Sequence, residues 1–171
     1  LKIGNGMDEG VNLGPLTTAK RLEEIEMLVD KTKKEGAEVL LGGKRPSGFN
    51  KGFFYEPTVF DHVKDDFTIM KEEPFGPLVP MLSFKSFDEV IERANDNDLG
   101  LCSYLYTNSM DKANRGSELL ETGCVAVNTG AVAIAEAPFG GIKQTGYGRE
   151  GGSMAIKDYL NVKYTHMALE I

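Results

Sequence analysis

The first part of the chain carries apolar residues at helical spacing. Leu22, Ile25, Leu28 and Val29 fall on one face of a helix, and charged residues occupy most of the positions between and around them. The run follows residues that can cap a helix start and precedes a residue that commonly ends helices: Thr17 or Thr18, and Gly36. The pattern predicts an amphipathic helix within residues 17–36.

Strand-like and helix-like segments alternate along the rest of the chain. Predicted strands lie at 37–41, 53–60, 78–84, 101–107 and 124–127. Predicted helices lie at 86–95 and 109–122, and Ser86 with Glu89 three residues later forms a capping box. Strands that alternate with helices imply a parallel sheet with right-handed crossovers. We therefore expect an α/β fold, a mostly parallel open sheet with helices on both faces and a ligand crevice beyond the carboxyl ends of its strands.

The composition fits a globular protein and excludes two classes of partner. The chain has 171 residues, of which 41% are hydrophobic, and a formal net charge of -7. This negative charge works against binding to nucleic acid, and no apolar stretch approaches the length of a membrane span. The two cysteines lack disulfide or metal-site spacing, and the start lacks a signal-peptide pattern, so we expect a cytoplasmic location.

The sequence offers no catalytic nucleophile and no metal site. Cys102 and Cys124 lie inside predicted strands, where nothing activates a thiol, so core packing is their expected role. His62 and His166 lack neighbouring ligands at a metal-binding spacing. The segment 146–151 fits G-x-G-x-x-G but follows polar residues instead of an apolar strand, which favours a glycine loop over a dinucleotide cradle.

One loop has a constrained backbone around a carboxylate and an aromatic ring. Pro74, Gly76 and Pro77 restrict the chain around Glu73 and Phe75. A preorganised carboxylate can accept hydrogen bonds from two hydroxyl groups, as in a ribose, while the ring covers a flat group. From the residues alone, an ordinary proline-rich turn is the favoured alternative.

Three motifs in the sequence resemble motifs of the aldehyde dehydrogenase superfamily. They are KEEPFGP at 71–77, APFGGIK at 137–143 and GYGRE at 146–150, and they are similar to the C-terminal part of that family's catalytic domain. Residues 128–141 are similar to the branch that includes succinate-semialdehyde and 2-oxoglutarate-semialdehyde dehydrogenases. The resemblance implies oxidation of an aldehyde, expected to be a semialdehyde, to a carboxylate through a thioester, with NAD or NADP as cofactor.

The resemblance also implies roles for five residues. Glu73 would hold the hydroxyls of the nicotinamide ribose, and Phe75 would pack beside that ribose and its ring. Thr129 and Ala133 lie in the loop that would set substrate choice, and Phe139 would wall the aldehyde pocket. Ala133 stands where succinate-semialdehyde enzymes place a serine that holds the distal carboxylate. This difference argues against succinate semialdehyde itself as the substrate.

In the family, the nucleophilic cysteine, the general base, the oxyanion-holding asparagine and the Rossmann domain all precede the matching segment. We therefore expect a catalytic-domain fragment at 1–159, inactive alone, and an oligomerisation strand and tail at 160–171. Asn161–Ala168 would pair with a neighbouring subunit of a homo-oligomer. The other expected partners are an aldehyde and the missing cofactor-binding part of the same chain. The alternative is a non-enzymatic α/β binding or scaffold module, which would show the same composition and alternation.

Overall fold

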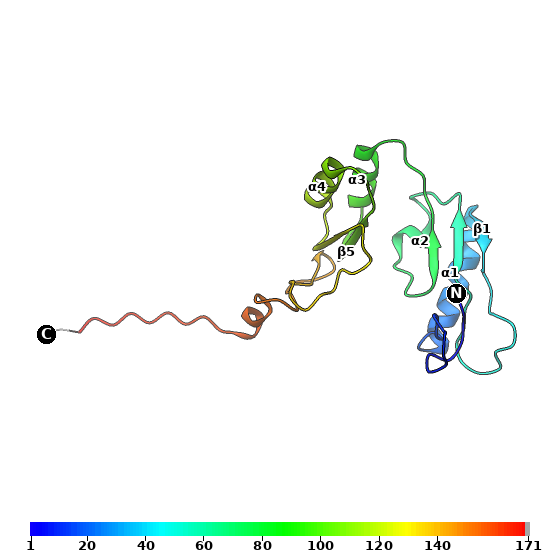
Figure 1. Ribbon diagram of the computed structural model, residues 1–171, viewed down its shortest axis with the longest axis horizontal. Coiled ribbons are helices and arrows are strands. Elements are labelled where there is room, and N and C mark those ends of the chain that lie inside the picture. The colour runs from blue at the N-terminus through cyan, green and yellow to red at the C-terminus, as the bar shows by residue number, and fades with distance from the viewer. Residues whose placement is uncertain (170–171) are drawn as a thin grey trace. The chain divides into compact units, whose positions relative to one another are not determined.

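The structure is a computed structural model that describes residues 1–169, and the chain divides into two compact units (Figure 1). Unit 1 is residues 1–84, and unit 2 begins at Lys85. Unit 1 contains α1 (Ala19–Glu35), β1 (Glu38–Leu41), β2 (Thr58–Asp61), α2 (Thr68–Lys71) and β3 (Leu78–Pro80). Unit 2 contains α3 (Phe87–Asn95), β4 (Leu99–Gly100), β5 (Cys102–Leu105), α4 (Met110–Leu119), β6 (Cys124–Val127), β7 (Ile142–Lys143) and the 3-10 helix η1 (Ala155–Tyr159). Both units combine helices with strands, which confirms the predicted α/β class.

Helix α1 begins and ends at the residues that the sequence pattern predicts. Thr18 Oγ1 accepts a hydrogen bond from the N–H of Arg21 at 3.1 Å. Gly36 adopts a φ of 110°, in the left-handed region, and its N–H bonds to carbonyls of the last turn. The four apolar residues of the pattern are all buried. The amphipathic helix predicted within 17–36 is therefore confirmed.

The sheet of unit 1 has the strand order β1-β2-β3. β1 runs antiparallel to β2, whereas β2 runs parallel to β3. The core of unit 1 contains Leu22, Ile25, Leu28, Val29, Tyr55, Phe60, Val63, Phe67, Ile69 and Leu78. These side chains come from both helices, two strands and the segments between them, so burial of apolar surface holds the elements of unit 1 together.

Unit 2 contains a strand, a crossover helix and a second strand that runs parallel to the first. β5 pairs with β6 in parallel, from Cys102 opposite Cys124 to Leu105 opposite Val127, and α4 connects the two strands. This is the pairing that the alternation predicts. The two short strands β4 and β7 pair in the antiparallel direction.

Within residues 1–169, the strands form three small sheets instead of one open sheet. Two of the pairings are parallel and two are antiparallel. β3 and β5, which were expected in one sheet, belong to different units. The alternation of strands and helices predicts that two strands joined by a helix run parallel. Long-range packing decides which further strands pair with them.

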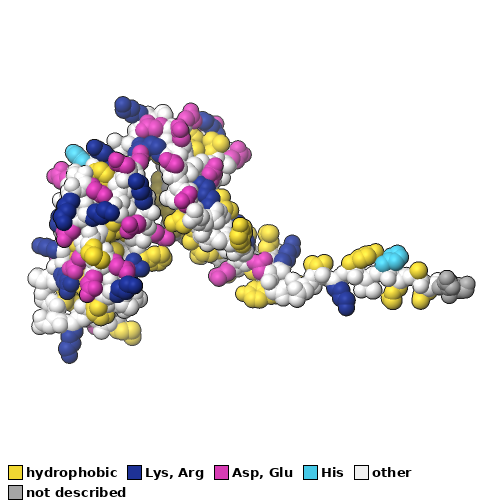
Figure 2. Space-filling view, turned by 180° about the vertical axis from the view of Figure 1, so that it is seen from behind, with side chains coloured by type: hydrophobic (Ala, Val, Ile, Leu, Met, Phe, Trp, Pro, Cys, Tyr) yellow, Lys and Arg dark blue, Asp and Glu magenta, His cyan; other side chains and the backbone are white. Residues whose placement is uncertain are grey.

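The segment after η1 forms no strand within residues 160–169 (Figure 1). Its side chains are exposed, and Figure 2 shows hydrophobic groups along its length. Val162 is 100% exposed and Tyr164 is 83% exposed. The pairing of Asn161–Ala168 with a neighbouring subunit and the division between 1–159 and 160–171 stay predictions.

Candidate functional site

Glu73 and Phe75 lie on the tight loop between α2 and β3. The N–H of Phe75 donates to the carbonyl oxygen of Glu73 at 3.1 Å, and the N–H of Gly76 donates to that of Pro74 at 2.6 Å. Each contact spans only two residues, so the chain turns sharply at this point. The geometry agrees with the constrained backbone expected from Pro74 and Gly76.

Gly76 brings this loop against the core of unit 1. A Cβ at this position would lie 2.5 Å from Cδ1 of Ile25, a separation that real side chains do not tolerate. Ile25 is itself only 1% exposed. The backbone after Phe75 therefore rests directly on the buried face of α1.

The side chains of Glu73 and Phe75 face solvent. Phe75 is 70% exposed, and the exposed side-chain carboxylate of Glu73 makes no hydrogen bond or ion pair within residues 1–169. A carboxylate with free oxygens can accept two hydroxyl hydrogens, and an exposed ring offers an apolar surface to a planar group. The chemistry of this pair therefore fits a ribose with an attached aromatic ring.

In unit 2, Asn128 connects β6 to the loop 129–136. Its Oδ1 accepts from the N–H of Thr107 at 2.9 Å, and its Nδ2 donates to the carbonyl of Thr107 at 2.9 Å. Asn128 has a φ of 56°, so the chain turns away from the sheet at this residue. The two hydrogen bonds fix the point at which the loop begins.

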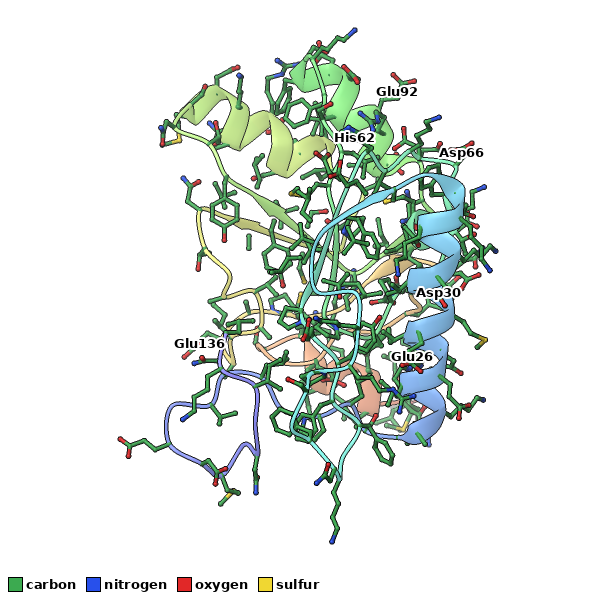
Figure 3. The ribbon with its side chains drawn as sticks, turned by 90° about the vertical axis from the view of Figure 1, so that its right-hand side faces the viewer. Glu26, Asp30, His62, Asp66, Glu92 and Glu136 are labelled. Carbon is green, nitrogen blue, oxygen red and sulfur yellow. The ribbon has the colours of Figure 1, made fainter. Side chains whose placement is uncertain are left out.

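The loop 129–136 is exposed over most of its length. Thr129 Oγ1 accepts a hydrogen bond from the N–H of Ala131 at 3.1 Å, which makes a local turn. The side chains of Thr129 and Ala133 are both exposed, and Figure 3 labels Glu136 at the far end of the loop. The loop therefore presents the Thr129 hydroxyl and the Ala133 methyl group to solvent.

Phe139 lies just beyond the loop and is held by its backbone. Its N–H donates to the carbonyl of Glu150 and its carbonyl accepts from the N–H of Glu150, both at 2.7 Å. Arg149 Nη1 donates to the carbonyls of Gly141 and Gly148 at 2.8 and 2.7 Å. The half-buried Phe139 side chain is thus positioned by a backbone bridge that an arginine reinforces.

Residues 1–165, which include the Glu73–Phe75 loop and the loop 129–136, match the aldehyde dehydrogenase family. The chain belongs to the aldehyde dehydrogenase family. The resemblance stated from the sequence is therefore confirmed.

Relatives within the aldehyde dehydrogenase family carry semialdehyde names. The chain is 42% identical over 98% of its length to a mitochondrial succinate-semialdehyde dehydrogenase of Oryza sativa subsp. japonica, of which it covers 31%. It is 44% identical over 96% of its length to a glutarate-semialdehyde dehydrogenase of Pseudomonas putida, of which it covers 33%. The chain thus spans about a third of the length of the curated relatives it matches.

Solved structures, an aldehyde dehydrogenase among them, have the same fold over this segment. A Bacillus cereus aldehyde dehydrogenase in complex with NAD+ matches with a TM-score of 0.91 at 44% identity, over 95% of this chain and 33% of that one. An NADP-dependent enzyme from E. coli matches with a TM-score of 0.93 at 41% identity, over 99% of this chain and 35% of that one.

The two cysteines of this family member lie side by side at the start of β5 and β6. Cys102 and Cys124 are register partners, and Cys124 Sγ lies 3.7 Å from the carbonyl oxygen of Gly140. Both are half-buried, and burial raises the pKa of the Cys102 thiol, with a further contribution from Cys124. A raised thiol pKa lowers the fraction of reactive thiolate. The structure therefore disfavours the thiolate form of Cys102, and the expectation that neither cysteine is the nucleophile stays a prediction.

The histidines have no metal-binding surroundings. His62 lies 3.7 Å from Asp61, its sequence neighbour, and His166 lies 3.3 Å from the Tyr164 hydroxyl. Over the residues that the structure describes, no group of three or more His, Cys, Asp or Glu side chains could hold a metal ion.

None of the helices in residues 1–169 has the length and apolar character needed to cross a membrane.

Each unit contains one group of the residues singled out from the sequence. Unit 1 carries Glu73 and Phe75, and unit 2 carries Thr129, Ala133 and Phe139. Their roles in the family stay predictions.

Two supporting residues were not identified from the sequence. Arg149 belongs to the GYGRE motif, but nothing local indicates that it reaches the carbonyl of Gly141. Glu35 is one of several charged residues near the end of α1, and its partner Thr68 lies 33 positions later. Only an alignment with related sequences could have provided a signal for such a pair.

Proposed function

We propose that this chain is the part of an NAD(P)-dependent aldehyde dehydrogenase that positions the nicotinamide end of the cofactor and lines the aldehyde pocket. The substrate is an aldehyde of the semialdehyde class, and the product is a carboxylate. The observation that carries this proposal is the exposed Glu73–Phe75 pair on a constrained loop, in a chain of the aldehyde dehydrogenase family. Relatives named for semialdehydes support the substrate class.

The residues of unit 1 would orient the cofactor. Glu73 would accept hydrogen bonds from the two hydroxyls of the nicotinamide ribose, and Phe75 would cover one side of the adjacent ring. A bound NAD or NADP supplies the acceptor for the hydride that the aldehyde carbon loses. Because Glu73 and Phe75 lie on a loop that rests on the core, they would hold the ribose in a fixed place and favour the reactive geometry.

The reacting thiol would come from another part of the protein. Cys102 and Cys124 are the two cysteines of this sequence, and both are half-buried within strands. We therefore propose that the 171-residue chain alone does not oxidise aldehydes, because thioester formation needs an activated thiolate.

The role of Glu73 is tested by Glu73→Gln in the full-length enzyme that carries this segment. Loss of the carboxylate loosens the ribose, so we expect single-turnover NAD(P)H formation to slow by about 10- to 100-fold, while aldehyde capture stays unchanged. Glu72→Gln is the matched control, because Glu72 is also exposed but precedes the turn. Equal rates for Glu73→Gln and the unmodified enzyme would refute the assignment.

Substrate choice is tested at Ala133. An alanine offers no hydroxyl to a distal carboxylate, so Ala133→Ser should raise kcat/KM for succinate semialdehyde by about tenfold relative to an uncharged aldehyde of similar length. Ala135→Ser, in the same exposed loop, is the control. If the ratio of the two specificity constants does not change, position 133 does not face the distal end of the substrate.

Assembly and location complete the proposal. Residues 161–168 would pair with a neighbouring subunit of a homo-oligomer, a role supported by their exposed apolar and β-branched side chains. The cytoplasmic location expected from the composition stays a prediction, because the relatives include proteins named as mitochondrial and chloroplastic.

A further inference from the structure

The start of α2 is held by a carboxylate from another helix. Phe67, at the N-cap position of α2, provides no side-chain hydrogen bond to the helix. Instead, Glu35 at the end of α1 accepts two hydrogen bonds from Thr68, one from the N–H at 3.0 Å and one from the hydroxyl at 2.6 Å. Both carboxylate oxygens of Glu35 are thus used on a single residue of α2.

The surroundings keep Glu35 ionised. The hydrogen bond from the Thr68 hydroxyl is the main cause that lowers the pKa of Glu35, against the opposing effect of burial. The positive charges of Lys31 and Lys71 lower the pKa further. An ionised carboxylate forms stronger hydrogen bonds than a neutral acceptor, so its charge strengthens the two hydrogen bonds that Glu35 accepts from Thr68.

Thr68 also bonds to the residue that precedes the Glu73–Phe75 loop. Its carbonyl oxygen accepts the N–H of Glu72 at 3.0 Å, the bond that closes α2. Glu72 immediately precedes Glu73. Two hydrogen-bonded steps therefore connect the Glu35 carboxylate to the residue next to Glu73.

We propose that Glu35 is a positioning residue for the cofactor loop, acting through Thr68 on the placement of the Glu73 side chain. The inference rests on the proposed role of Glu73. Phe67 and Ile69 are 6% and 3% exposed and pack α2 against the core of unit 1. Loss of Glu35 therefore removes the polar constraint on the start of α2 and leaves the apolar packing in place.

The test uses a graded series in the full-length enzyme. Glu35→Ala removes both acceptors, and we expect single-turnover NAD(P)H formation to slow by about 3- to 10-fold. Glu35→Gln keeps one acceptor oxygen and should fall between Glu35→Ala and the unmodified enzyme. Thr68→Ser keeps both donors and should retain the normal rate. The control is Glu24→Ala, which removes an α1 carboxylate whose ion pairs within residues 1–169 are with Lys20 and Arg21 of the same helix.

A double-mutant cycle separates positioning from general destabilisation. If Glu35 acts through Glu73, then Glu35→Ala should have little further effect on hydride transfer in a Glu73→Gln background. Additive effects of the two substitutions, or a normal rate for Glu35→Ala beside a slow Glu73→Gln, would overturn the positioning role and leave the proposed function intact. A normal rate for Glu73→Gln would overturn the proposed role of Glu73 and this inference together.

Discussion

The two units place their candidate residues by different physical means. Unit 1 has a continuous core of large side chains, and Glu73 and Phe75 sit on a loop that rests on this core. In unit 2, the buried apolar side chains among the described residues are Ile91 and Ala126. Phe139 is instead positioned by backbone hydrogen bonds and by glycines that approach other backbone closely. Unit 1 should therefore be the more sensitive to lost side-chain volume. In unit 2, where few apolar side chains are buried, added volume at a closely packed glycine should have a larger effect than truncation of a side chain.

The largest effect is expected for Phe60→Ala in unit 1. Phe60 is fully buried in the core, so truncation should lower the free energy of unfolding by about 3–5 kcal/mol, as measured by urea denaturation. Phe84→Ala is the control, because Phe84 is 55% exposed, and it should change stability by less than about 1 kcal/mol. Equal losses for the two variants would show that the core does not hold unit 1 together.

The second prediction concerns Gly123 in unit 2. A Cβ at this position would overlap the carbonyl oxygen of Gly140 and lie 2.8 Å from its carbonyl carbon. Because both partners are backbone atoms, Gly123→Ala should lower stability by about 2–3 kcal/mol in the same measurement.

The control for Gly123 is Gly130→Ala, since nothing lies within 4 Å of a Cβ at Gly130. If both alanine variants are as stable as the unmodified chain, the glycine packing of unit 2 does not contribute to its fold.

The smallest effect is expected from the titration of Tyr55 in unit 1. Burial raises the pKa of this phenol to about 12 from its ordinary 10.0, and the charges of Glu26 and Asp30, which project from α1 in Figure 3, add to the shift. The folded state disfavours the ionised form, so this contribution is complete below pH 10 and is lost as the pH rises from 10 to 12. Over that range, the chain should lose about 2 kcal/mol more stability than the Tyr55→Phe variant. Parallel pH curves for the two proteins would contradict this.

Local patterns in the sequence predicted α1, α3 and α4, although α4 ends at Leu119 instead of residue 122 and α2 was not predicted. Thr18 and Gly36 bound α1 as expected, and Ser86 accepts the N–H of Glu89 at 3.1 Å at the start of α3. The Glu89 carboxylate accepts the N–H of Lys85, one residue before the N-cap, and not that of Ser86 as a full capping box requires. Such contacts join residues three or four apart, so the order of residues is sufficient to predict them.

Strands were predicted less completely than helices. The expected strand at 53–60 is formed only from Thr58, and the two-residue strands β4 and β7 carry no pattern long enough to recognise. The parallel pairing of β5 with β6 was predictable because α4 lies between them in sequence. The antiparallel pairing of Leu99 with Lys143 was not predictable, because the two residues are 44 positions apart in the sequence.

The sequence by itself determined the family, both ends of α1, the start of α3 and the constrained loop around Glu73 and Phe75. It could do so because each depends on a short run of residues: a motif, a cap, or prolines that restrict the backbone beside a glycine that permits a sharp turn. Only the tertiary structure decided the division into two units, the grouping of strands into three sheets and the contact between Glu35 and Thr68. These features join distant segments, and their partners are selected by the burial of apolar surface and by close backbone packing across the whole fold.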